Sequence, residues 1–135
     1  MPSRSLPGGN SISSINAILG TPTPVSLITV ASGTVQFGYN MPTDTAVVTA
    51  ANGSNTAVTL PDPFLEGYQP GDFYEVINGT SQALVIFPPS GGKINAASAN
   101  SSVALPAATT TNNAAARLYV ITAASGASTF TFCSG

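Results

Sequence analysis

Charge is what this 135-residue sequence most lacks. Three Lys or Arg and five Asp or Glu residues make up 6% of the chain, and there is no histidine. An average soluble domain is about 25% charged. A surface built mostly from Ser, Thr, Asn, Gly and Ala is poorly protected against self-association. We therefore expect a protein that packs against copies of itself or against a larger assembly.

The same scarcity of ionisable groups argues against two classes of function. Histidine is the commonest general acid or base, and Lys93 is the sole lysine, so the sequence favours no enzyme. With a net charge of −2, three scattered cations cannot neutralise a row of phosphates. We expect no catalytic residues and no nucleic-acid partner.

Cysteine, long apolar runs and a leader are also scarce or missing. Cys133 is the single cysteine, so no intrachain disulfide can form, and one thiol without an imidazole cannot complete a tetrahedral zinc site. We interpret Cys133 as a small apolar residue at a strand end, with an intermolecular disulfide as the alternative. No run reaches the ~18 apolar residues of a membrane span, and the first residues lack the apolar stretch of a secretory signal. We expect no cofactor, no metal and no membrane partner.

Residues 1–24 differ from the rest because seven of them are Pro or Gly, which disfavour regular structure. Within this segment, Ile12, Ile15, Ile18 and Leu19 have helical spacing, and Ser11 could cap a short helix. Four large aliphatic side chains need a surface to bury against. We interpret the segment as an arm that contacts a capsid or a neighbouring subunit. The alternative is a flexible tail.

From residue 24 onward, short β-prone runs alternate with turn residues. An Ala-Ser-Gly loop predicts a hairpin between 25–30 and 34–39. Asn52-Gly53 and Asn78-Gly79 predict two more, since Asn-Gly favours tight turns. The expected strands are Val25–Val30, Thr34–Tyr39, Thr45–Ala50, Thr56–Leu60, Phe73–Ile77, Ala83–Phe87, Ser102–Leu105, Arg117–Thr122 and Thr129–Phe132.

The number and spacing of these runs predict an all-β fold. Eight or nine short strands are typical of a single β-sandwich or a jelly-roll-like barrel. Residues 1–24 form the extended arm and residues 25–135 the β domain. The low-complexity stretch 107–116 is expected to be a solvent-facing or contact loop.

The loop Pro61–Asp72 combines three prolines, three acidic residues and two aromatic residues, a composition that is typical of functional loops. We assign it as a second contact region through Phe64, Leu65 and Tyr68. Its carboxylates, with Glu75, are interpreted as loop caps and solvated charges. Calcium ligation is the alternative, although the spacing lacks the register of a calcium loop, and a hydrolytic carboxylate pair is a weaker one.

One stretch carries a resemblance to known proteins. Gly71-Asp-Phe-Tyr-Glu-Val-Ile-Asn-Gly-Thr-Ser-Gln-Ala-Leu-Val-Ile-Phe-Pro-Pro-Ser-Gly-Gly-Lys-Ile-Asn95 resembles a pattern found in small virion proteins of tailed bacteriophages. There a Gly-Asp run, an Asn-Gly-like turn and a Pro-x-x-Gly segment precede an Ala/Asn-rich stretch and a closing strand pair. The resemblance covers roughly residues 56–132.

Within that group, the match in size is to capsid decoration (cement) proteins, which are often trimers on the outer shell. The resemblance implies a non-enzymatic homotrimer that binds the major capsid protein, stabilises the capsid and assembles in the host cytoplasm as part of the virion. A tail, neck or fibre component is one alternative. A carbohydrate-binding module for host adhesion is another, for which the four tyrosines would supply the sugar-stacking face.

Overall fold

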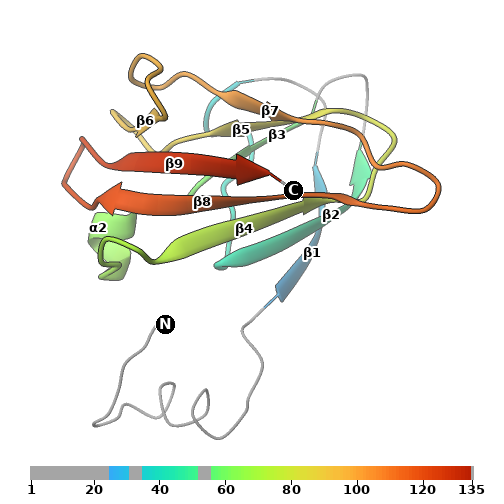
Figure 1. The fold of residues 1–135 in the computed structure, drawn as a ribbon, viewed down its shortest axis with the longest axis horizontal. Helices are drawn as coiled ribbons and strands as arrows, with labels where there is room; N and C mark the ends of the chain where they lie inside the picture. Colours follow the sequence, from blue (N-terminus) through green and yellow to red (C-terminus); the bar gives the residue numbers. More distant parts are fainter. Residues whose placement is uncertain (1–24, 31–34, 52–55, 135) are drawn as a thin grey trace, which may run out of the picture.

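The computed structural model describes residues 25–30, 35–51 and 56–134. They form two β-sheets packed face to face, with one short helix at one end (Figure 1). The predicted all-β, sandwich-like fold is confirmed, and the sheets do not close into a barrel. The predicted arm, with Ile12, Ile15, Ile18 and Leu19, lies outside the described residues.

The elements follow one another along the chain as short strands separated by loops. They are β1 (Val25–Val30), β2 (Thr45–Ala51), β3 (Thr56–Thr59), α2 (Pro63–Glu66), β4 (Phe73–Asn78), β5 (Leu84–Phe87), β6 (Lys93–Ile94), β7 (Val103–Leu105), β8 (Ala114–Thr122) and β9 (Thr129–Ser134).

The large sheet has the strand order β1-β2-β4-β8-β9-β6, and the small sheet has the order β3-β5-β7. In the large sheet β1, β2 and β4 are parallel, β8 and β9 each run antiparallel to their predecessor, and β6 pairs parallel with β9. In the small sheet β3 is parallel to β5, and β7 is antiparallel to it. Consecutive strands therefore often belong to different sheets.

The core lies between the two sheets because each strand alternates buried and exposed side chains, as a half-buried strand should. In β4, Tyr74 and Val76 are fully buried while Phe73 and Glu75 point outward. The small sheet contributes its own buried positions from β3, β5 and β7. The largest fully buried side chains are Tyr74, Phe130, Leu84, Ile86, Ile94, Leu105, Leu118, Val48, Val58, Val76 and Val120.

The Asn78-Gly79 hairpin prediction was wrong. The two runs are strands, but β4 pairs with β8 and β5 pairs with β3 and β7, so the chain crosses between sheets at this point. A tight type I′ turn needs positive φ at both central residues, and neither Asn78 nor Gly79 has one. Asn78 is instead fully buried, and its amide bonds to backbone oxygens of Gln82 and Pro106 at 2.7 and 2.9 Å.

The other two hairpin predictions were also wrong. β1 pairs in parallel with β2, and residues 35–39 form turns rather than a strand. The chain leaves these turns to bond the edge of β3, where Met41 N donates to Thr59 O and Thr59 N donates to Tyr39 O. The Asn52-Gly53 turn lies outside the described residues, but its flanking strands β2 and β3 belong to different sheets.

The start of β8 differs from the sequence prediction. β8 begins at Ala114, so only the first part of the low-complexity stretch is a loop, which projects beyond the sheets between β7 and β8 (Figure 1). The alanines at 114, 115 and 116 pair with Asn78, Ile77 and Val76 of β4, which are far along the chain. Pairing with a strand far along the chain overrides their modest β propensity.

Candidate functional site

The loop 61–72 contains the short helix α2, which the sequence analysis did not predict. Asp62 caps it by accepting a hydrogen bond from Phe64 N at 3.0 Å, Pro63 occupies the first turn, and Gly67 ends it at φ 75°. An acceptor side chain before a helix, proline at its start and a left-handed glycine after it are the usual boundary signals. These signals were present in the sequence and could have indicated the helix.

This helix holds two large hydrophobic side chains in solvent. Phe64 is 51% and Leu65 80% exposed. Both belong to the contact region predicted from the sequence. Because the cap and the left-handed end fix the helix, their orientation does not depend on a partner.

Tyr68, the third predicted contact residue, is placed differently. Its ring is half-buried and stacks on Tyr74, with centroids 4.6 Å apart and planes 15° from parallel. The Tyr74 hydroxyl donates to Glu66 Oε1 at 3.0 Å. Tyr68 therefore joins the loop to the core, and only its outer side borders the contact region.

Burial raises the pKa of Glu66 above its usual 4.5; the hydrogen bond from Tyr74 opposes this shift, and the nearby Asp44 and Asp62 carboxylates add to it. Burial also raises the pKa of both tyrosines. The two phenols are therefore neutral at physiological pH and act as hydrogen-bond donors.

Asp62 and Asp72 accept hydrogen bonds from loop backbone, as expected of loop caps, whereas Glu75 lies within β4 and is ion-paired rather than a cap. Asp72 Oδ2 accepts from Gln69 N at 2.8 Å and closes the loop, while Glu75 pairs with Arg117. Within the part of the chain that the structure describes, no three His, Cys, Asp or Glu side chains form a group that could hold a metal ion. The arrangement offers apolar and hydrogen-bonding contacts rather than ionic ones.

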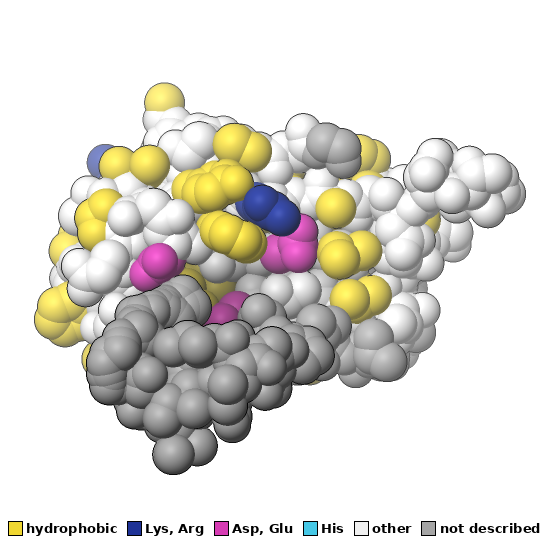
Figure 2. All heavy atoms as spheres, turned by 60° about the horizontal axis from the view of Figure 1, so that its bottom comes forward, with side chains coloured by type: hydrophobic (Ala, Val, Ile, Leu, Met, Phe, Trp, Pro, Cys, Tyr) yellow, Lys and Arg dark blue, Asp and Glu magenta, His cyan; other side chains and the backbone are white. Residues whose placement is uncertain are grey.

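The outward side of the large sheet carries a second group of exposed side chains, which the sequence analysis missed. Strand register places Phe73 opposite Tyr119, and Glu75 opposite Arg117. The Phe73 and Tyr119 rings lie 5.3 Å apart, and the guanidinium of Arg117 lies 4.5 Å from the Phe73 ring centre. Arg117 Nε also approaches Glu75 Oε2 at 3.3 Å. Figure 2 shows hydrophobic side chains gathered beside a basic and an acidic one on one face.

Hydrogen bonds raise the pKa of the Arg117 guanidinium, chiefly the bond with Tyr119 and secondly the bond with Glu75, so the group stays charged. The charge is compensated within the protein. A partner that covers this face therefore meets rings, aliphatic side chains and one neutralised ion pair.

An open hollow of about 420 Å³ separates α2 from Ile121, which lies on the outward side of β8. It lies where the end of β8 meets the loop after α2, so one apolar surface runs from α2 to the outer face of the sheet. Its lining residues are Phe64, Gly67, Tyr68, Gln69, Pro70, Ile121, Thr122 and Ala123.

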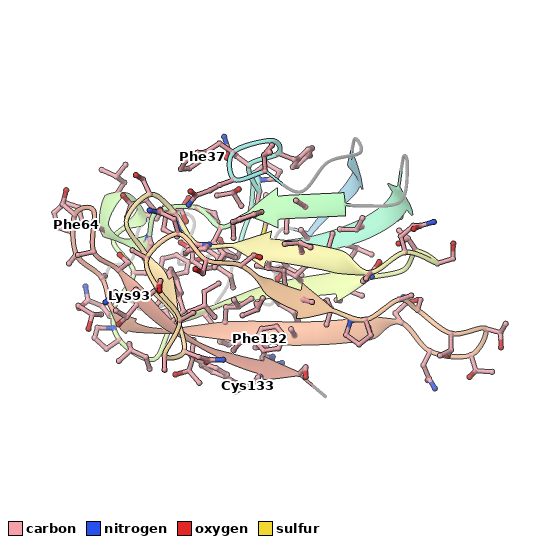
Figure 3. All side chains as sticks on the ribbon, turned by 90° about the horizontal axis from the view of Figure 1, so that it is seen from above. Phe37, Phe64, Lys93, Phe132 and Cys133 are labelled. Carbon is pink, nitrogen blue, oxygen red and sulfur yellow. The ribbon has the colours of Figure 1, made fainter. Side chains whose placement is uncertain are left out.

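Two further exposed hydrophobic residues, Val35 and Phe37, lie elsewhere, in the turns that cover the edge of β3. Figure 3 shows Phe37 and Cys133 on opposite sides of the molecule. Phe37 is 51% exposed, the same as Phe64. The predicted face of four tyrosines is not formed, because Tyr74 is fully buried and Tyr119 lies on the outer face of the sheet.

Comparisons with known proteins leave the family open. No protein-family model, curated protein or solved structure matches the chain. Among the described residues, no helix combines the length and apolar character needed to cross a membrane.

Proposed function

We propose that the chain is a non-enzymatic structural virion protein, a homotrimeric capsid decoration (cement) protein that binds the major capsid protein on the outer surface and stabilises the shell. The observation that carries the proposal is the apolar surface formed by α2 and the hollow beside it. Leu65 is 80% and Phe64 51% exposed on a capped helix. Large apolar surfaces held in solvent mark sites of protein association.

The chemistry of this surface suits broad, charge-poor contact. Its lining is apolar or carries hydroxyl and amide groups, which can bond a partner without desolvating ions. Interface cores are depleted of charge and enriched in aromatic residues. Such a protein stabilises a shell by linkage, because it binds the assembled shell and not its dissociated parts. A trimer adds avidity by engaging several coat subunits at once.

A matched pair of variants tests the proposal. Phe64→Ser removes a ring from the α2 surface, and Phe37→Ser removes an equally exposed ring from the turns at the edge of β3. Truncation of a central interface side chain typically costs about 1.4 kcal/mol or more, which is about tenfold in affinity. We expect Phe64→Ser to weaken cosedimentation with shells of the same virion lacking this protein about tenfold, and Phe37→Ser to leave it unchanged.

Light scattering tests the oligomeric state independently, and we expect the molar mass of three chains. Equal losses from both variants would move the contact away from α2. A wild-type protein that does not cosediment with the shells would overturn the cement proposal, and binding to tails or necks instead would assign it there.

A carbohydrate-binding module is the second candidate, favoured by the Phe73–Tyr119 pair on an open sheet face. Aromatic rings on such a face can stack on apolar sugar faces, and Arg117 and Glu75 beside them could bond sugar hydroxyls. Binding of glycans that Phe73→Ser abolishes would support it over the cement proposal. Absence of glycan binding by the wild type would exclude the carbohydrate-binding function.

A further inference from the structure

The outer face of the large sheet ends in a patch of hydrophobic side chains near the start of β4. We call Phe73, Tyr119 and Ile121 the outer apolar patch. Phe73 is 37% and Ile121 52% exposed, and Tyr119 lies opposite Phe73 and two residues from Ile121. The patch faces away from the core between the sheets, so a cover must come from outside the sandwich.

The chain enters the large sheet at the same end of the sheet as this patch. Val25, the first residue of β1, lies opposite Thr45, which in turn lies opposite Glu75. Because β1, β2 and β4 are parallel, residues before Val25 reach the sheet at the end where Phe73 precedes Glu75. The 24 residues before β1 therefore join the fold at the same end of the sheet as the patch.

The connection is long enough for these residues to reach the patch of their own subunit. Leu19 is six residues from Val25, a span of up to about 20 Å in extended chain. From β1 to β8 there are three strand spacings, about 14 Å. A tethered segment that can span the distance sees its site at a high effective concentration, which favours its own chain over a second copy.

The sequence of this segment complements the surface. Four of its large aliphatic residues are grouped at positions 12–19, as Ile12, Ile15, Ile18 and Leu19. Its only charged side chain is Arg4, whereas the loop at this end of the sheet carries Asp62, Glu66 and Asp72, none of which forms an ion pair with another described residue. The aliphatic residues of the segment thus match the outer apolar patch, and its one cation matches the acidic loop beside that patch.

We infer that Ile12–Leu19 docks on the outer apolar patch of the same chain and covers it. This contact is independent of the virion proposal. It assigns the aliphatic side chains of the arm to their own subunit. Because Ile121 forms one wall of the hollow beside α2, the surface left for a partner is Phe64 and Leu65.

The single cysteine provides the test. Cys133 is exposed and lies opposite Arg117, on the same outward side as Phe73 and Tyr119. A nitroxide attached to Cys133 of the ¹⁵N-labelled full chain should strongly broaden the amide signals of residues 12–19. Reduction of the nitroxide should restore them. In a mixture of ¹⁵N-labelled Cys133→Ser protein with unlabelled, nitroxide-bearing protein, the same signals should keep their intensity.

Variants show whether the aliphatic side chains are responsible. Ile15→Asn with Ile18→Asn should abolish the broadening, and the matched Ser13→Asn with Ser14→Asn should retain it. Ile121→Asn, an exposed change on the patch, should also abolish it. Absence of broadening in the wild type would overturn the inference. Broadening in the mixed sample would overturn docking within one chain and assign the segment to a second copy.

Discussion

Asn78 holds the crossing between the two sheets, and its replacement by alanine should destabilise the protein more than any exposed asparagine would. Its side chain is fully buried and makes four hydrogen bonds. Nδ2 donates to the backbone oxygens of Gln82 and Pro106, and Oδ1 accepts from Thr80 N and Thr80 Oγ1 at 3.0 and 2.8 Å. These bonds join the end of β4 to the segments before β5 and after β7.

The magnitude follows from the number of bonds. At about 1 kcal/mol for each hydrogen bond, Asn78→Ala should lower the free energy of unfolding by about 4 kcal/mol, with a further penalty wherever a buried partner stays unpaired. For an m-value of roughly 2 kcal/mol/M in urea, the unfolding midpoint should fall by about 2 M. Since domains are stable by about 5–15 kcal/mol, the variant should fold but with a reduced margin.

Urea unfolding monitored by circular dichroism measures this loss. Asn112→Ala is the matched control, because Asn112 is exposed and its Nδ2 reaches only Thr111 Oγ1 at 3.4 Å. We expect the control to change the free energy of unfolding by no more than about 0.5 kcal/mol. If Asn78→Ala cost no more than the control while the m-value stayed the same, Asn78 would be a surface turn residue and the account of the crossing would be wrong.

Two further predictions concern glycine positions and pH. Gly91 and Gly67 both have φ 75°, but a Cβ on Gly91 would lie 2.0 Å from Gly126 O, whereas one on Gly67 meets nothing within 4 Å. Gly67→Ala should therefore cost about 1–2 kcal/mol from backbone strain alone, and Gly91→Ala clearly more in the same urea assay; equal losses would contradict the close approach. Because burial raises the pKa of Glu66, with the hydrogen bond from Tyr74 opposing it, the folded state binds its proton more tightly than the unfolded state. The free energy of unfolding of the wild type should thus fall as pH rises from 4.5 through the raised pKa. Glu66→Gln should remove that part of the fall and should match the wild type at lower pH. A difference in stability between the two proteins that does not change with pH would refute this cause.

Most of the strands could be predicted from the sequence, but their partners could not. Alternation of Phe130 and Phe132 with Thr129 and Thr131 indicates which face of the strand turns inward, and that information is local. An Asn-Gly pair is compatible with a tight hairpin and with a crossing between sheets. The choice at Asn78 depends on the backbone oxygen of Pro106, 28 residues away. No short-range pattern contains that contact.

The candidate site could likewise be predicted only where the signal is local in the sequence. Phe64 and Leu65 were assigned to a contact region because they lie in a loop whose prolines, carboxylates and aromatic residues are typical of functional loops, and that composition is a local signal. The outer face was missed because Glu75 and Arg117 are 42 residues apart and become neighbours only through the pairing of β4 with β8. The two-residue strand β6 is too short to carry any periodic signal.

Scarcity of charge also determines how the edges of the sheets are protected. Exposed edges are usually blocked by charged residues, proline, short strands or a cover. Here β3 is bonded by residues 39–41, β6 has two residues, and β7 has three and is followed by Pro106. The remaining edge, β1, is the longest of the four, and its sequence Val-Ser-Leu-Ile-Thr-Val has no charge or proline. Val25, the first residue of β1, therefore lies on one of the two surfaces of the large sheet that most need a cover, its edge, and at the same end of the sheet as the other, the outer apolar patch. A protein with more lysine could leave both exposed; this one has a single lysine, on β6 at the opposite edge of the sheet.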